Sequence, residues 1–213
     1  MDGSTPHSHG PVPAAAPRAD AAWRALQAAT AQLHAEVEAA PLMAALMSPG
    51  VDREILAEVL QRMLRIHAGW EQANAPRLQV LAWPWRPRAQ VLRDDLMALG
   101  VRPTTQALPA PVAGCEAEAW GMLYVVEGSA LGGRLIARHL RQHVPELAAV
   151  VRHFEGAGDG PGWPAFRAAL EQALPDDAAR SGAATAAAAM FSHFHGQLAR
   201  PTVVTGDAGT VTA

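Results

Sequence analysis

The chain has one cysteine, no lysine and no long hydrophobic run, and each of these absences excludes a class of protein. A single thiol, Cys115, cannot form an internal disulfide and fits a reducing compartment. No stretch of 18 apolar residues is uninterrupted, so no transmembrane helix is expected. The N-terminus also lacks the basic and apolar regions of a signal peptide. We therefore expect a cytoplasmic protein.

The charge balance argues against a nucleic-acid partner. All 17 cationic residues are arginine, and the formal net charge of the 213 residues is -3. Surfaces that bind nucleic acid normally carry a basic excess. Half of the residues are apolar, so the chain is long and hydrophobic enough to bury the core of one globular domain.

Alternating strand patterns are missing too, and apolar residues recur at helical spacing instead. The predicted helices span 20–40, 53–78, 90–99, 121–144, a short segment ending at 154, 163–174, and a last one from Asp176 or Ser181 to 200. Asp20 and Asp52 are the expected caps, and Pro41 the expected stop of the first helix. We predict an all-α, single-domain bundle of seven or eight helices over 20–199, with a disordered arm at 1–19 and a flexible tail at 200–213.

The stretch 121–144 reads as one amphipathic helix, yet it carries Gly128, Gly132 and Gly133 in its middle. Each interior glycine costs about 0.8–1 kcal/mol relative to alanine. Gly128 and Gly132 lie four residues apart and therefore share one face. Two interpretations fit: a close helix–helix crossing, or a flat ligand laid against bare backbone. The Ser129 hydroxyl either serves such a ligand or bonds back to a helix carbonyl.

The histidines form no recognised metal motif. His34, at the edge of the buried stripe of the first helix, and His67, in the second long helix, are most simply structural when each is taken alone. The sequence has no HExxH, no clustered His and Cys, and no ExxH spacing of di-iron bundles. A GxSxG elbow and a phosphate-binding loop are missing as well. A metal centre made only of protein side chains is therefore not expected.

Two segments together resemble the heme oxygenase family. TAQLHAEVE at 30–38 and LYVVEGSALGGRLIARHL at 123–140 are similar to the two signature helices of that family, in the same order and about 90 residues apart. The likeness extends loosely over 22–198 and is strongest to bacterial, biliverdin-producing members associated with bacteriophytochromes. The fold implied by the resemblance is a heme oxygenase-like helical bundle.

The resemblance also implies roles for individual residues. Heme b would be both cofactor and substrate, its iron bound axially by His34. The backbones of Gly128 and Gly132 would close over the opposite face of the heme, Gly133 would help the helix to kink, and Ser129 lies on the same turn. The implied reaction uses O2 and electrons from a ferredoxin or reductase and gives biliverdin, carbon monoxide and ferrous iron. A bilin-accepting phytochrome is the implied recipient.

One departure from the family pattern concerns the heme propionates. Many relatives carry a lysine one or two turns before the proximal histidine, where this sequence offers Gln27, with Arg24 a turn earlier. Arginine is a capable carboxylate partner. Arg24 and Arg138 are the predicted propionate-binding residues, and Tyr124 is expected to pack in the core more than to reach a propionate.

Two further interpretations stay open. One is a heme-binding or heme-handling protein with the same helical fold and little turnover. The other is a similar bundle that binds a different small molecule, as thiamine-degrading and quinone-cofactor proteins do. The first predicts heme binding without bilin formation, and the second predicts no heme binding.

Overall fold

Helices make up most of the backbone that the structure describes. The computed structural model describes residues 20–156 and 161–200, and these contain eight α-helices, one 3-10 helix and no strand. The helices are α1 (Ala21–Glu38), α2 (Pro41–Leu46), α3 (Arg53–Leu78), α4 (Ala89–Ala98), α5 (Glu116–His143), η1 (Pro145–Val150), α6 (Arg152–Glu155), α7 (Gly162–Ala173) and α8 (Asp177–Leu198). The all-α prediction is confirmed. The predicted arm at 1–19 and nearly all of the predicted tail lie outside the described residues.

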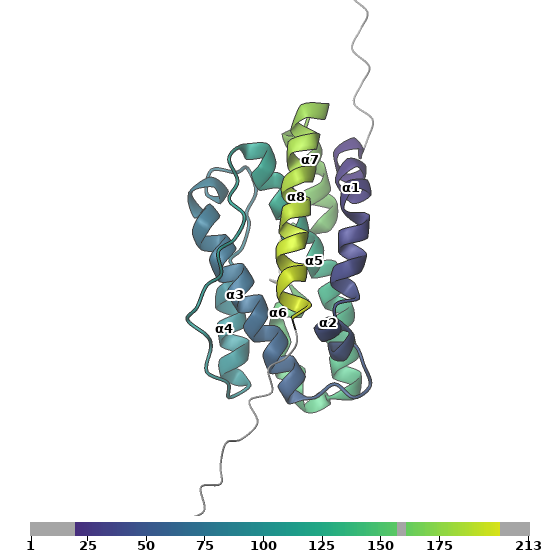
Figure 1. Ribbon diagram of the computed structural model, residues 1–213, viewed down its shortest axis with the longest axis vertical. Coiled ribbons are helices and arrows are strands. Elements are labelled where there is room, and N and C mark those ends of the chain that lie inside the picture. Colours follow the sequence, from purple (N-terminus) through teal and green to yellow (C-terminus); the bar gives the residue numbers. More distant parts are fainter. Residues whose placement is uncertain (1–19, 157–160, 201–213) are drawn as a thin grey trace, which may run out of the picture.

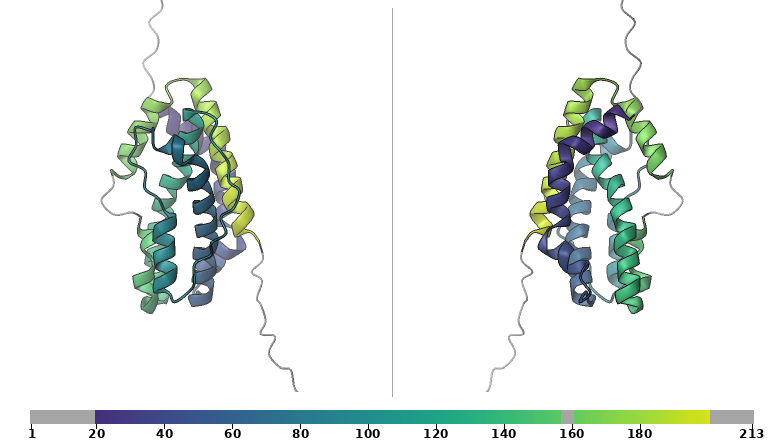
Figure 2. Two further views of the ribbon diagram at one scale, coloured as in Figure 1. Left: turned by 90° about the vertical axis from the view of Figure 1, so that its left-hand side faces the viewer. Right: turned by 90° about the vertical axis from the view of Figure 1, so that its right-hand side faces the viewer.

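The long helices lie side by side as a bundle (Figure 1). α8 packs against α5 and also against α1, while α3 and α4 form the opposite side. Figure 2 shows the same bundle from its two sides. Within the described residues, none of the helices combines the length and apolarity needed to cross a lipid bilayer.

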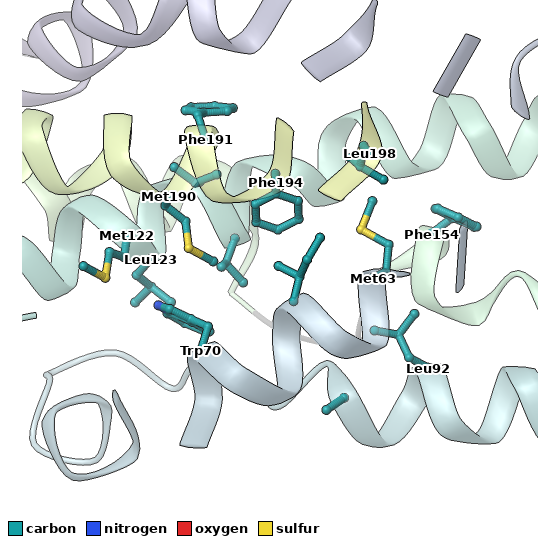
Figure 3. Packing of buried hydrophobic residues seen from close by; sticks show 14 of the residues in the cluster. Met63, Trp70, Leu92, Met122, Leu123, Phe154, Met190, Phe191, Phe194 and Leu198 are labelled. Carbon is teal, nitrogen blue, oxygen red and sulfur yellow. The ribbon is translucent and has the colours of Figure 1, made fainter. Parts of the chain in front are cut away.

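The core is built from large apolar side chains of every long helix. Trp70 of α3, Trp120 of α5 and Phe166 of α7 are among the largest fully buried side chains. Figure 3 shows two aromatic residues of α8 pointing in different directions, Phe194 into the core toward α3 and Phe191 toward α1. α8 therefore contributes a ring to each side of the bundle.

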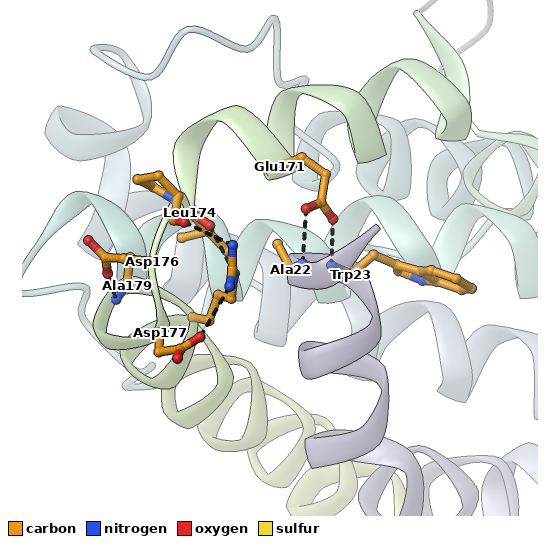
Figure 4. Close-up of polar contacts among 9 residues, drawn as sticks. Ala22, Trp23, Glu171, Leu174, Asp176, Asp177 and Ala179 are labelled. Carbon is orange, nitrogen blue, oxygen red and sulfur yellow. Dashed lines mark hydrogen bonds and ion pairs between the residues drawn. The ribbon is translucent and has the colours of Figure 1, made fainter. Parts of the chain in front are cut away.

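The start of α1 differs from the sequence prediction. Asp20 adopts a left-handed conformation (φ 67°) and its side chain makes no capping bond; it forms an ion pair with Arg167 instead, at 2.5 Å. The cap comes from α7, where the Glu171 carboxylate accepts hydrogen bonds from the backbone N–H groups of Ala22 and Trp23, both at 3.0 Å (Figure 4). The prediction of an Asp20 cap was wrong because a carboxylate far away in sequence satisfies the same donors.

Three other residues were predicted to mark the start or end of a helix, and two of them are caps. Asp52 and Asp176 cap α3 and α8, accepting from Ile55 N at 2.9 Å and Ala179 N at 2.8 Å. Of the two predicted starts of the last helix, Asp176 is therefore the correct one: it is the N-cap, and α8 begins at Asp177. Pro41 does not simply terminate the first helix, because α1 ends at Glu38 and Pro41 is the first residue of α2, where a missing backbone N–H has no cost.

Candidate functional site

Two glycines of α5 lie where another part of the chain crosses the helix backbone. A Cβ atom at Gly121 would overlap the carbonyl oxygen of Ala183 on α8, and one at Gly133 would overlap the carbonyl oxygen of Phe154 on α6. Only glycine allows backbones to approach this closely. The crossing interpretation therefore accounts for Gly133, which the sequence had grouped with the ligand-facing glycines, and for Gly121, which the sequence did not single out.

Gly128 and Gly132 have different surroundings. A Cβ atom at Gly128 would lie 3.5 Å from Cη2 of Trp163, an ordinary van der Waals distance, and one at Gly132 would meet no described atom within 4 Å. No crossing backbone requires a glycine at either position. The ligand interpretation thus stays a prediction for these two glycines, while the crossing interpretation accounts for Gly133.

Two polar contacts show that the face of α5 that carries Gly128 and Gly132 is turned toward α1 and α2. The Thr30 hydroxyl of α1 donates to the Leu26 carbonyl at 2.7 Å and is also within hydrogen-bonding reach of the Tyr124 phenol of α5. Burial raises the pKa of Tyr124, and the Thr30 hydrogen bond partly offsets that rise. About four turns further along α5, His139 Nε2 lies 3.0 Å from the Ser48 carbonyl, just after α2. Both contacts join α5 to the α1–α2 side of the bundle.

Between these two contacts lies an open stretch of α5. Tyr124, Gly128, Gly132, Leu135 and His139 follow one another at spacings of three or four residues and so share one helix face. From residue 124 to residue 139 the helix rises about 22 Å. We call Gly128, Gly132 and Leu135 the glycine face. α1 and α5 run in the same direction along this side (Figure 2), and His34 comes one turn after Thr30, so α1 carries its histidine into the same interval.

His34 presents a free imidazole nitrogen. Its side chain is 56% exposed, and its Nε2 lies 3.7 Å from Glu38 Oε1, which is too long for a hydrogen bond. The imidazole ring meets the Phe191 ring edge-on, with centroids 5.5 Å apart at 80°. The histidine is therefore held in place by an aromatic neighbour while its nitrogens remain available to a ligand.

The side chains around the glycine face suit a flat, mostly apolar ring. Leu131 and Leu135 of α5 are 43% and 53% exposed, so both add apolar surface beside the two open glycines. The backbone at Gly132 is open, and His34 supplies an imidazole, the commonest ligand of protein-bound iron porphyrins. These residues fit a heme.

Three other predicted site residues take the following places. The Ser129 hydroxyl donates to the Val126 carbonyl at 2.7 Å, so the back-bonding alternative describes it. Arg24 on α1 and Arg138 on α5 are exposed. Neither forms an ion pair with another described residue, so both guanidinium groups are available to carboxylates.

A cluster of one buried and two half-buried histidines was missed by sequence reasoning. The His67 ring on α3 lies 5.5 Å from the rings of His153 and Phe194. Nδ1 of His67, Nδ1 of His153 and Nε2 of His193 are buried without a hydrogen-bond partner. Among the described residues no group of three or more His, Cys, Asp or Glu side chains is arranged to hold a metal ion. His67 falls within the apolar stripe of its helix, but no periodicity could place His153, which comes from a four-residue helix, beside it.

A buried carboxylate positions His153. Asp95 of α4 is fully buried and accepts hydrogen bonds from Arg152 Nε at 2.9 Å and from the His153 backbone N–H at 2.8 Å. Burial, followed by the nearby Arg88 guanidinium, lowers the pKa of His153 to about 3. Burial is also the main cause that lowers the pKa of His67, with smaller contributions from His153 and Arg88. Both imidazoles are neutral at pH 7.

This neutrality predicts a pH-dependent stability. Below pH 6.5 the unfolded chain binds protons on His67 and His153 that the native chain excludes, so the free energy of unfolding falls as pH falls. Each histidine contributes up to about 1.4 kcal/mol per pH unit. Urea denaturation between pH 7 and pH 5 measures the slope. His67→Phe should flatten it, and an unchanged slope in this variant would contradict the assignment.

The sequence and fold were compared with known proteins. The family model described as heme oxygenase matches residues 20–200. A curated heme oxygenase of Xanthomonas campestris pv. campestris (strain 8004) is 47% identical over 162 residues, covering 74% of this chain and 97% of that protein.

Two solved structures extend the comparison to the fold. A heme oxygenase from Neisseria meningitidis, solved in NO- and CO-bound forms, superposes with a TM-score of 0.66 at 25% identity, covering 83% of this chain and 89% of the other. A heme oxygenase from Leptospira interrogans gives a TM-score of 0.65 at 16% identity, covering 84% and 98%, which supports the fold alone. The family match over nearly all of the described residues and the 47% identical relative lead to one conclusion: this chain belongs to the heme oxygenase family.

Proposed function

We propose that the chain cleaves heme oxidatively with O2 and electrons, giving biliverdin, carbon monoxide and ferrous iron. One observation carries this proposal: in a member of the heme oxygenase family, the open backbone at Gly132 and the available imidazole of His34 belong to the same side of the bundle. When bound, the heme supplies the iron that activates O2 and the porphyrin ring that is opened. The residues of the chain bind and orient the heme.

His34 is the proposed axial ligand of the iron. Its exposed ring is fixed on one side by Phe191, so little rearrangement is needed for a nitrogen to bind a metal. Glu38 follows one turn later on α1, and its carboxylate lies 3.7 Å from Nε2, so a small side-chain rotation would let it accept from the ring N–H that does not bind the iron. A carboxylate partner of this kind orients a histidine ligand and makes it more basic.

Gly128 and Gly132 are the proposed covering residues on the opposite side of the heme. A helix backbone without side chains leaves room for a small gas molecule and brings no acidic group to it. Peroxidases, in contrast, place polar side chains over the iron to promote O–O cleavage. The Ser129 hydroxyl is committed to Val126, so donation from Ser129 to a ligand requires that bond to break.

Arg24 of α1 and Arg138 of α5 are the proposed partners of the heme propionates, because both guanidinium groups are exposed. They lie toward opposite ends of the interval between the two helices, so each would pair with a propionate in a different orientation of the ring. A planar guanidinium pairs well with a carboxylate. Electrons come from a separate ferredoxin or reductase, and a bilin-accepting phytochrome is the proposed recipient of the product. The family resemblance supports both of these partner assignments.

Turnover of hemin tests the proposed function. The purified chain, incubated with hemin, a ferredoxin system and air, should lose its Soret band while the red absorption of a bilin grows. A Soret band that persists would instead support the non-catalytic heme-binding protein. No Soret shift on adding hemin would support a bundle that binds another small molecule, the alternative least compatible with the family match.

A further inference from the structure

A cavity lies beside α5 next to the glycine face, and the indole of Trp163 lies between this cavity and Gly128. The cavity borders α5 and α7, and its lining includes Trp83, Glu127, Arg134, Glu155, Trp163 and Phe166. Trp163 also lies 3.5 Å from the position of a Cβ atom at Gly128. The same side chain thus contacts the glycine face and lines the cavity.

Trp163 is held in place by other rings. Its indole stacks on Phe166 at a centroid distance of 5.4 Å and an interplanar angle of 23°, and lies 5.9 Å from the Tyr124 ring. Phe166 in turn contacts Trp83 at 5.1 Å and Trp120 at 5.8 Å. Each aromatic pair adds about 0.5–1.5 kcal/mol beyond its buried area. The indole is therefore packed on two other rings at the point where Gly128 and the cavity meet.

One arginine of the cavity, Arg134, forms no ion pair with another described residue. Glu127 forms an ion pair with Arg88 at 3.4 Å, and Glu155 forms one with Arg141. A carboxylate that reached this cavity would find a free guanidinium, a favourable partner.

We infer that Trp163 is a positioning residue that limits the in-plane rotation of the heme and keeps its propionates away from Arg134. The inference rests on the proposed function, because it requires heme on the glycine face. With the indole present, the edge of the ring abuts Trp163 and Arg134 is screened. With the indole removed, the glycine face opens into the cavity and Arg134 competes for a propionate.

Proton NMR of the ferric, cyanide-bound complex tests this inference, because the hyperfine-shifted heme methyl signals report the in-plane orientation directly. The wild type should show one dominant orientation. Trp163→Ala should raise the minor orientation several-fold, and Trp163→Phe should raise it less. Arg134→Ala alone should change nothing, while Trp163→Ala/Arg134→Ala should lose most of the new orientation. Trp85→Phe, which alters an indole that packs on Trp70 instead, is the matched control.

The outcomes separate the inference from the function on which it rests. If the wild type binds no hemin, the proposed function fails and the inference fails with it. If hemin binds and Trp163→Ala keeps the wild-type methyl pattern, only the inference is wrong. A shift caused by Arg134→Ala alone would also overturn it, because Arg134 would then be an ordinary propionate partner. Circular dichroism of each apoprotein verifies folding, and Trp163→Phe keeps the test decisive if the alanine variant unfolds.

Discussion

Replacing Gly132 by leucine should stabilise the apoprotein slightly and remove most of its heme turnover. No described atom lies within 4 Å of the new Cβ, and leucine is a better helix former than glycine by roughly 0.8 kcal/mol. The same side chain occupies the space over the helix backbone where we propose that heme and O2 bind. The rate of bilin formation should fall at least about tenfold, which corresponds to about 1.4 kcal/mol. Urea denaturation and the hemin assay measure the two effects.

Two matched glycines serve as controls. Gly196 of α8 also has no described atom within 4 Å of its Cβ position, so Gly196→Leu should change stability in the same direction and leave turnover intact. Gly121→Ala should instead lower the stability of the fold, by about 3 kcal/mol. The reason is that its new Cβ overlaps a backbone carbonyl of α8 that cannot move aside. If Gly132→Leu retained full turnover, Gly132 would have no role in the heme site.

These glycines show how far the sequence could lead. Spacing placed Gly128 and Gly132 on one face, and the cost of interior glycines indicated that something approaches the helix. Spacing could not reveal what lies opposite each one, because that depends on tertiary packing. Gly133 proved to face α6, and Gly121 to face α8. In the sequence, a glycine beside open space looks the same as a glycine crossed by another backbone. Only the neighbouring residues in the folded chain distinguish the two kinds.

Helix boundaries were more predictable where the signal is local. Asp52 and Asp176 cap the helices that directly follow them, since the side chain bonds to a backbone N–H three residues on. Asp20 has the same local signal, yet Glu171 takes over its role from α7. A local signal fails when a distant group competes for the same donors, and a single sequence holds no record of that competition.

In the candidate site, too, residues within a local motif were predicted and residues placed by tertiary packing were not. His34 and the glycine helix were found because two motifs in the right order resemble a family, which the family match confirms. Phe191 and Trp163, which hold His34 and border Gly128, carry no motif and resemble ordinary core residues in sequence. The residues proposed to contact the heme are thus easier to recognise from sequence than the residues that surround them.

Replacing His34 by alanine should abolish the native axial ligation of the iron. We expect the ferric Soret band and the electron paramagnetic resonance spectrum to change, and hemin affinity to fall by at least about tenfold, or about 1.4 kcal/mol. The apolar side chains near the glycine face should still retain some heme. Added imidazole should restore the wild-type spectrum, because it can occupy the space left by the missing ring.

The fold of this variant should survive, since the His34 side chain is more than half exposed and makes one edge-on contact with Phe191. His143→Ala is the matched control, because His143 is another exposed histidine, located at the end of α5, and its removal should leave the ferric spectrum unchanged. Glu38→Gln should produce a smaller change than His34→Ala, since it removes the charge that orients the imidazole and keeps the ligand itself. An unaltered spectrum in His34→Ala would mean that another residue binds the iron, and the heme would then have to lie elsewhere than between α1 and the glycine face.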